Sequence, residues 1–444
     1  MRQDEPQRNT PSPAPAPTEG PETSGGTAPS PTGRKAGPHQ PPRLGVGARL
    51  RNSRAALSRT IDRAEEARRT ARAEQLRYVG EESSTTRGGS PSKTASASAR
   101  AAALETLPSW LVRGGIGAWL LLGLIVYLFL VFLGERFLRL LSYPYLLGVF
   151  CLLLLCSALF FGTEIGGSRN WIVFGPFAVQ PSEFGKIVII MFLAAYLTEH
   201  REVLTLPRHR LLWLKLPVLR FIAPLLLIWG IAILMFVVQR DLGSALLFFG
   251  IAVSMTYMAT GRKSYVARAF AFFLGAAALS YSFFSHVRVR FNIWLDPWSD
   301  PSGSAYQVVQ SLFALGSGGV WGAGFAHGHP NLIPEVHTDF IFAAIAEELG
   351  LLGSLGVMLV FALFFYRAIR IALACREETR MLLAAGIAVV FLLQAFIIIA
   401  GVTKFLPLTG ITLPFVSYGG SSMIASFMLL GILTVLSKKE NRHG

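Results

Sequence analysis

The chain has 444 residues, of which 52% are hydrophobic and only 15% are charged, with a mean hydropathy of +0.48. This composition excludes an ordinary soluble protein of this length and indicates a polytopic membrane protein. The net charge of +15 would suit a nucleic-acid partner, but basic loops beside apolar helices explain it, so we expect no nucleic acid.

The first 107 residues differ in composition from the rest and carry 17 basic and 11 acidic residues, a net charge of +6. Residues 1–47 are rich in Pro, Ser, Thr and Gly and are predicted to be disordered, because they bury too little apolar surface to fold. Residues 48–78 turn to Arg, Ala and Glu, which predicts a polar helix. A solvated helix is favoured there over contact with anionic lipid or a partner. Residues 80–106 form a Ser/Thr/Ala-rich linker.

The region from 108 to 444 contains runs of about 20 apolar residues, the length of a membrane-crossing helix, and lacks the alternation of barrel strands. The predicted fold is therefore an all-α transmembrane bundle. Its nine predicted helices lie near 110–133, 143–162, 184–198, 221–238, 241–260, 266–284, 340–366, 381–402 and 413–436.

Loops rich in Lys and Arg alternate with loops that are not, and the positive-inside rule places the basic ones in the cytoplasm. The basic segments are 199–220, 261–268, 367–380 and the tail from Lys438. Loops 163–182, 239–240, 285–339 and 403–412 are then predicted to face outward. The longest, 285–339, carries many apolar and aromatic residues, so we expect ordered, partly membrane-embedded structure there. Its glycine cluster at 316–319 follows no strand and predicts tight turns and close helix packing, not a dinucleotide site.

Three polar segments stand at predicted outward helix ends. The first segment is Gln180-Pro181-Ser182-Glu183, followed by Lys186. Glu183 and Lys186 are three residues apart, so they can pair with each other or converge on a shared polar cavity, where a functional role is expected. A purely structural ion pair is the alternative. In His337-Thr338-Asp339, Asp339 begins a predicted helix, where the helix dipole favours an ionised carboxylate. Taken alone, a plain N-cap explains Asp339 about as well as catalysis.

The third segment, Leu413-Pro414-Phe415-Val416-Ser417-Tyr418-Gly419-Gly420-Ser421-Ser422, has a proline and a glycine pair that should loosen its helix. Loosened backbone at membrane depth is tolerated when it lines a polar cavity, and close helix packing by small residues is the alternative. Of the three cysteines, Cys151 and Cys156 lie in an apolar run and Cys375 in a basic loop, so buried thiols are predicted, with neither a disulfide framework nor a metal clip.

Together these three segments, the second running on through Ala346-Glu347-Glu348-Leu349-Gly350, resemble the signature of the SEDS family. These are the shape, elongation, division and sporulation proteins typified by RodA, FtsW and SpoVE. The resemblance covers roughly residues 110 to 440. It implies a bundle of about nine to ten helices, with the long outer loop before the eighth family-type helix. The family typically has ten spans with both ends inside, so on the present count this chain lacks the first one.

The resemblance further implies a peptidoglycan glycosyltransferase that polymerises lipid II into glycan strands at the outer face of the cytoplasmic membrane and releases undecaprenyl pyrophosphate. Asp339 is then the catalytic residue. The implied substrate-binding residues are Glu183, Lys186, Ser417 and five outward cations that suit pyrophosphate, Arg169, Arg240, Arg288, Arg290 and Lys404. Each cation has a headgroup anchor as its alternative role.

No cofactor is expected with certainty, although a divalent cation, Mg²⁺ or Mn²⁺, would help to neutralise pyrophosphate. No compact ligand cluster predicts a dedicated metal site. The implied partner is a class B penicillin-binding protein, and the shared motifs leave elongation, division and sporulation open. A flippase that moves lipid II across the bilayer is the rival function. It would need polar lining across the full depth, whereas here the ionisable residues gather at outward helix ends.

Overall fold

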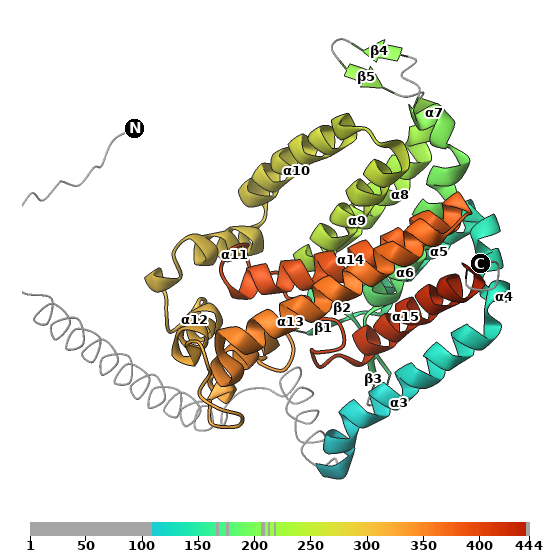
Figure 1. Cartoon of the computed structure of the whole chain (residues 1–444). Helices are drawn as coiled ribbons and strands as arrows, with labels where there is room; N and C mark the ends of the chain where they lie inside the picture. The colour runs from blue at the N-terminus through green and yellow to red at the C-terminus, as the bar shows by residue number, and fades with distance from the viewer. Residues whose placement is uncertain are drawn as a thin grey trace, which may run out of the picture. The chain divides into compact units, whose positions relative to one another are not determined.

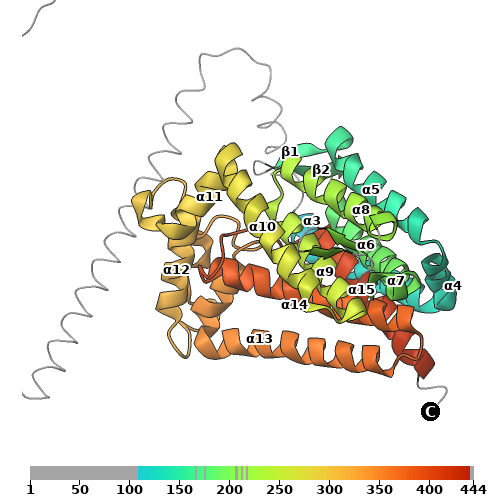
Figure 2. The same cartoon turned by 90° about the horizontal axis from the view of Figure 1, so that it is seen from above.

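The computed structural model describes residues 109–165, 168–174, 177–205, 209–211, 214–216 and 219–440 (Figures 1 and 2). The chain divides into two units, Met1–Gly88 and Gly89–Gly444, and every described residue belongs to the second. The predicted disordered tail, polar helix and linker of residues 1–107 therefore lie outside the described residues.

Each of the nine predicted apolar segments contains a helix. These helices are α3 (Ser109–Leu133), α5 (Pro144–Phe161), α6 (Pro181–Glu199), α8 (Leu219–Val238), α9 (Leu242–Thr260), α10 (Lys263–Phe283), α13 (Ile341–Ala374), α14 (Glu378–Val402) and α15 (Gly420–Glu440). By length and composition, seven helices of the described chain can cross a membrane, or eight if α3 and the segment beyond its 79° bend form one span. The apolar part of α8, Ala223–Val238, is shorter. The protein is a multi-pass helical membrane protein.

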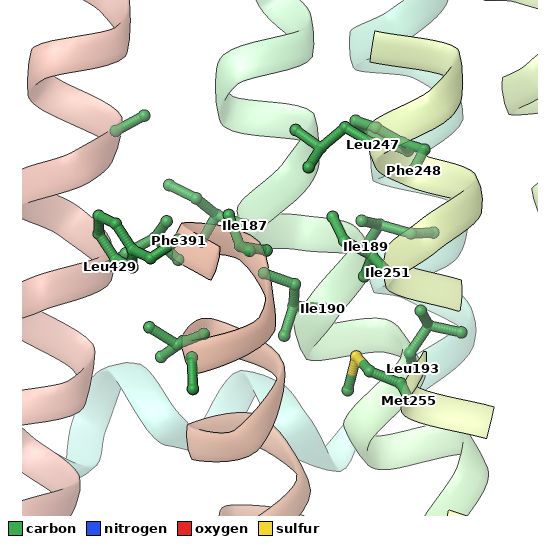
Figure 3. Close-up of a cluster of buried hydrophobic side chains, with 14 of the residues drawn as sticks. Ile187, Ile189, Ile190, Leu193, Leu247, Phe248, Ile251, Met255, Phe391 and Leu429 are labelled. Carbon is green, nitrogen blue, oxygen red and sulfur yellow. The ribbon is translucent and has the colours of Figure 1, made fainter. Parts of the chain in front are cut away.

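The helix α6 lies at the centre of the bundle, with 15 of its 19 residues buried. Figure 3 shows its isoleucines packed among side chains of α9, α14 and α15, which include Phe248, Phe391 and Leu429. By contrast, α10 has no buried residue and lies at the edge of the bundle beside α9. Ser182, Glu183 and Lys186, the polar side chains in the first turns of α6, are buried among these helices and therefore need partners.

Two short antiparallel sheets were not predicted. The segment after α5 forms β1 (Thr163–Ile165), β2 (Ser168–Phe174) and β3 (Phe177–Val179), in the order β1-β2-β3. Arg169 N donates to Gln239 O at 3.2 Å, which joins β2 to the turn between α8 and α9. The basic loop holds a second hairpin, β4 (His209–Leu211) and β5 (Leu214–Leu216), after α7 (Arg201–Thr205). The four strands other than β2 have only three residues each, which is too short to show a periodicity.

The long loop 285–339 is ordered. It contains α11 (Ser285–Leu295), η2 (Pro297–Ser299), α12 (Tyr306–Gly318) and η3 (Pro330–Leu332), and α12 packs against α13. The glycine prediction is confirmed, because a Cβ on Gly318 would lie 1.9 Å from Ala346 O. The remaining short helices, α4 (Glu135–Leu138) and η1 (Arg139–Ser142), follow the bend after α3. None of the three cysteines forms a disulfide. Cys151 and Cys375 are buried, as predicted, and Cys156 is half-buried.

One predicted helix start was wrong, and the capping role considered for Asp339 does not hold. The helix predicted from 413 begins only at Gly420, because Phe415 adopts a φ of 63° and Leu413 N bonds the Ser417 side chain instead of continuing a helix. The helix after Asp339 begins at Ile341 and its N-cap is Phe340. Asp339 therefore lies one residue before the cap, in a turn, so the N-cap explanation of this carboxylate does not hold.

Candidate active site

A cavity of about 460 Å³ lies where the polar ends of α6, α9, α11 and α14 meet the turn before α13 and the loop before α15. Six of the nine predicted site residues line it: Glu183, Lys186, Arg240, Arg290, Asp339 and Lys404. The first and the last of these are more than 200 residues apart in the sequence. Glu183, Asp339 and Tyr418, one from each of the three predicted polar segments, line the cavity, so the fold brings the segments to one place.

At the inner end of the cavity, Lys186 Nζ lies 2.5 Å from Glu183 Oε2, and the lysine side chain is only 1% exposed. The same ammonium donates to Gln394 Oε1 at 2.9 Å, and Gln394 Nε2 donates to Thr412 O at 2.9 Å. An ammonium has only donors, so the amide must turn its oxygen to Lys186. Gln394 thus links the buried ion pair to the loop before α15. Gln394 is not among the predicted site residues.

Asp241 is a second buried carboxylate in the cavity wall and caps α9. Its oxygens accept from Ser244 N at 2.9 Å, Ser244 Oγ at 2.8 Å, Asn170 Nδ2 at 2.8 Å and Gln180 Nε2 at 3.2 Å. Four donors stabilise the charged form and fix the β2 strand and the start of α6 against α9. This residue therefore has a framework role that its neighbour Arg240 does not share.

Asp339 lies in the 334–340 turn, half-buried, and its backbone N donates to Glu335 O at 3.2 Å. Burial, helped by the charges of Glu335 and Asp241, raises the pKa of Asp339 to about 6 against the opposing effects of Arg290 and Thr338. A Cβ on Gly410, whose φ is 73°, would lie 3.2 Å from Asp339 Oδ2. The glycine therefore keeps space open beside the carboxylate.

The Asp339 turn is fastened to the loop before α15. Ser417 Oγ donates to Thr338 O at 2.6 Å and accepts from Leu413 N at 2.8 Å, while Tyr418 N donates to His337 O at 2.7 Å. Ser417 is 3% exposed and does not line the cavity. Its position fits a residue that holds the Asp339 turn in place and does not fit direct contact with a substrate.

Backbone carbonyl oxygens accept hydrogen bonds from two cations of the cavity, Arg290 and Lys404. An Arg290 Nη donates to Leu408 O at 3.3 Å and Thr409 O at 3.2 Å, and Lys404 Nζ lies 3.4 Å from Leu295 O. Trp294 Nε1 donates to Lys404 O at 3.1 Å, one helical turn beyond Arg290. The side chain of Arg240 is exposed at the cavity wall. None of the carbonyl contacts neutralises the positive charge of Arg290 or Lys404, so these two groups remain able to attract an anion.

Arg169 and Arg288 do not line the cavity. Arg169 Nε donates to Gly162 O at 3.0 Å, and Arg288 donates to Ser282 O at 2.9 Å while its guanidinium lies 5.8 Å from the Tyr281 ring centre. Both side chains are tied to the end of the helix that precedes them. The structure thus separates two of the five predicted cations from the other three.

In the described part of the chain, no group of three or more His, Cys, Asp or Glu side chains could hold a metal ion. The two buried carboxylates of the cavity are also engaged, Glu183 by Lys186 and Asp241 by its four donors. These side chains do not fit a resident Mg²⁺ or Mn²⁺, and we assign no step to one.

Sequence similarity to known proteins extends over most of the chain. The family model described as "Cell cycle protein", which covers FtsW, RodA and SpoVE, matches residues 94–442. The chain belongs to this family. The peptidoglycan glycosyltransferase RodA of Mycobacterium tuberculosis is 38% identical over 330 residues, covering 73% of this chain and 70% of that protein. The stage V sporulation protein E of Bacillus subtilis is 38% identical over 303 residues, covering 66% and 78%.

Solved structures of the FtsW/RodA/SpoVE family share the fold. A chain of a peptidoglycan synthase complex that coordinates polymerisation and crosslinking matches with a TM-score of 0.61 at 28% identity, covering 75% of this chain and 91% of that one. RodA of Thermus thermophilus matches with a TM-score of 0.51 at 28% identity, covering 75% and 89%. The predicted family and helical membrane fold are confirmed.

Proposed function

We propose that this family member is a peptidoglycan glycosyltransferase that joins lipid II units into glycan strands. The names of its relatives support the reaction class. One observation of the structure carries the assignment to this cavity. A single cavity gathers a carboxylate whose pKa lies near 6, three cations and a buried ion pair.

In the proposed mechanism, Asp339 accepts the proton of the GlcNAc 4-hydroxyl of one lipid-linked sugar. The freed oxygen attacks the anomeric carbon of the other lipid-linked sugar, and the bond to undecaprenyl pyrophosphate breaks with inversion. Arg240, Arg290 and Lys404 face the negative charge that grows on the departing pyrophosphate. A general base works best with a pKa near the working pH, and the value of about 6 for Asp339 meets this condition.

The Glu183–Lys186 pair has a different role in this proposal. Its carboxylate is engaged by an ammonium at 2.5 Å and both residues are buried, so Glu183 is a poor base. We propose that the Glu183–Lys186 ion pair, which is neutral as a whole, turns its ammonium toward the inner end of the substrate site and that Gln394 fixes this direction. Arg169 and Arg288 stay outside this arrangement.

We further propose that the cavity opens on the outer side of the cytoplasmic membrane and that a class B penicillin-binding protein supplies the crosslinking activity. The charge of the loops supports the orientation. The membership of a similar solved chain in a synthase complex that couples polymerisation to crosslinking supports the partner. A divalent cation is proposed only as a counter-ion that arrives with the pyrophosphate.

The test is polymerisation by the purified protein in lipid vesicles that contain fluorescent lipid II, with the glycan strands resolved by gel electrophoresis. We expect strands that lysozyme digests. A parallel assay follows lipid II flipping by quenching of the label in the outer leaflet. Flipping without strands would contradict the glycosyltransferase assignment and favour the flippase.

A further inference from the structure

The loop 319–328 connects α12 to η3 and contains no Lys, Arg, Asp or Glu. Two of its side chains are almost fully exposed, Trp321 at 80% and Phe325 at 81%. Large aromatic side chains as exposed as these need an explanation, because they are costly in water. The Asp339 cavity does not include them.

This loop is bonded to α13 near the N-terminal end of that helix. Ala323 N and Gly324 N donate to the carbonyl oxygens of Glu347 and Glu348 at 2.9 and 3.0 Å. In the other direction, Leu351 N donates to Gly319 O at 2.9 Å. These bonds satisfy backbone groups that α13 leaves open, because Gly350 breaks its helical dihedral angles with a φ of 68° and a ψ of −162°.

The contact is backbone against backbone. A Cβ on Gly350 would lie 2.3 Å from Gly322 N, and a Cβ on Gly322 would lie 2.1 Å from Glu348 O. The loop therefore cannot move away from this level of α13 without breaking the bonds. The height of the loop along the membrane normal is set by the height of Gly350.

The sequence of α13 sets that height. The stretch from Leu349 to Tyr366 has no charged residue and is bounded by Glu348 and Arg367. Its 18 residues span about 27 Å at about 1.5 Å each, close to the hydrocarbon thickness of about 30 Å. Gly350 then lies at the hydrocarbon boundary on the cavity side.

The neighbouring surface of α13 is also apolar and exposed. Leu349, Leu351 and Leu352 flank Gly350 with exposures between 44% and 52%. Trp321 lies next to them, since a Cβ on Gly350 would lie 2.7 Å from its carbonyl carbon. The aromatic tip thus continues the lipid-facing surface of a spanning helix, at the depth where tryptophan is enriched in membrane proteins.

We propose that the 319–328 tip is a membrane anchor, with Trp321 and Phe325 inserted into the bilayer at the boundary between hydrocarbon and headgroups on the cavity side. The anchor fixes the outer end of α13, Ile341–Leu349, and with it the height of the Asp339 turn above the lipid. This inference uses no property of the glycosyltransferase reaction and stands or falls separately from it.

The test places a nitroxide label at the tip. The native cysteines Cys151, Cys156 and Cys375 are replaced by alanine, and single cysteines are introduced by Trp321→Cys and Phe325→Cys. Leu355→Cys, exposed within the apolar stretch of α13, is the lipid reference, and Ser302→Cys, exposed in the polar turn after η2, is the water reference. The labelled proteins are placed in nanodiscs of phosphatidylethanolamine and phosphatidylglycerol, without any partner protein.

We expect the two tip labels to collide with oxygen more than with a water-soluble nickel chelate, as the Leu355 label does. Labels that behave like the Ser302 label would overturn the proposal. So would labels shielded from both reagents, because protein would then cover the tip. As a check that needs no label, Trp321→Phe should remove fluorescence that brominated lipid quenches, and removal of an iodide-quenched component would contradict the anchor.

Discussion

The raised pKa of Asp339 predicts how polymerisation depends on pH. In the folded protein the pKa is about 6, against an ordinary value of 3.8, mainly because burial disfavours the charged form. A base must be ionised to accept a proton. The ionised fraction is about nine-tenths at pH 7 and about one-tenth at pH 5, so kcat/KM should be about tenfold lower at pH 5.

Asp339→Asn keeps the shape of the side chain and removes the base. The loss of rate should be on the order of 100-fold to 10,000-fold. The same substitution should lower the activity but should not lower the stability of the folded protein. The folded state binds the proton of Asp339 more tightly than the unfolded state does, so the stability of the parent protein falls as the pH rises from about 4 to about 6. Above pH 6 this loss of stability remains.

The gap between 3.8 and about 6 corresponds to at most about 3 kcal/mol. Asp339 keeps some contact with solvent, and screening reduces this to about 1–2 kcal/mol. Asp339→Asn should therefore be at least as heat-stable as the parent at pH 8, and the difference should vanish near pH 4. Replacing a carboxylate with a purely structural role would usually lower stability, so lost activity together with kept or increased stability would distinguish a catalytic role for Asp339 from a structural one.

The assay measures initial rates of strand formation from lipid II between pH 5 and 8. Two charge changes test the assignment further. Glu335→Gln removes a charge that raises the pKa, so the acid limb should move to lower pH, and Arg290→Gln should move it to higher pH. A flat profile between pH 5 and 7, or an Asn variant within tenfold of the parent, would refute the role of Asp339 as base.

Three further predictions concern the surroundings of the site. Gln394→Leu and Lys186→Met should each slow polymerisation, and the double variant should lose much less than the sum because the two side chains share one hydrogen bond; additive losses measured in this cycle would show independent roles. Ser417→Ala should lower both kcat and Tm and change KM little. The control Ser421→Ala, which removes a buried hydroxyl without a partner, should leave kcat and Tm nearly unchanged. Deletion of residues 1–88, which precede the part that the family model matches, should leave the specific activity within twofold of the full chain, and a large loss with a folded bundle would show a role for them.

The fold could be predicted because hydropathy is a local property. The segment predicted at 184–198 is helical over Pro181–Glu199, and the one predicted at 266–284 is helical over Lys263–Phe283. The break at Gly350 could not be predicted, since it depends on a loop that begins about 30 residues earlier and supplies the missing hydrogen bonds. A glycine in an apolar run carries no sign of this by itself.

The candidate site was predictable only in part. Motifs at helix ends pointed to Glu183, Lys186 and Asp339, and the fold brings them to one cavity. Nothing local separates Arg169, which bonds the preceding helix end, from Arg240, which lines the cavity. The signal for Gln394 was present as a single amide in an otherwise apolar span, where a polar group at membrane depth needs a partner.

Glu183 and Asp339, two of the carboxylates that line the proposed site, differ in environment, and this difference divides their tasks. Glu183 is held at 2.5 Å by an ammonium that Gln394 also binds, so its charge is already used. In the described part of the chain Asp339 forms no ion pair, and burial with the nearby charges of Glu335 and Asp241 favours its protonated form. Protonation is favourable for a carboxylate whose charged form is destabilised by burial, whereas protonation of a paired carboxylate breaks its ion pair and is unfavourable. Proton transfer in the cavity should therefore run through Asp339, with the paired residues holding charge in place for the substrate.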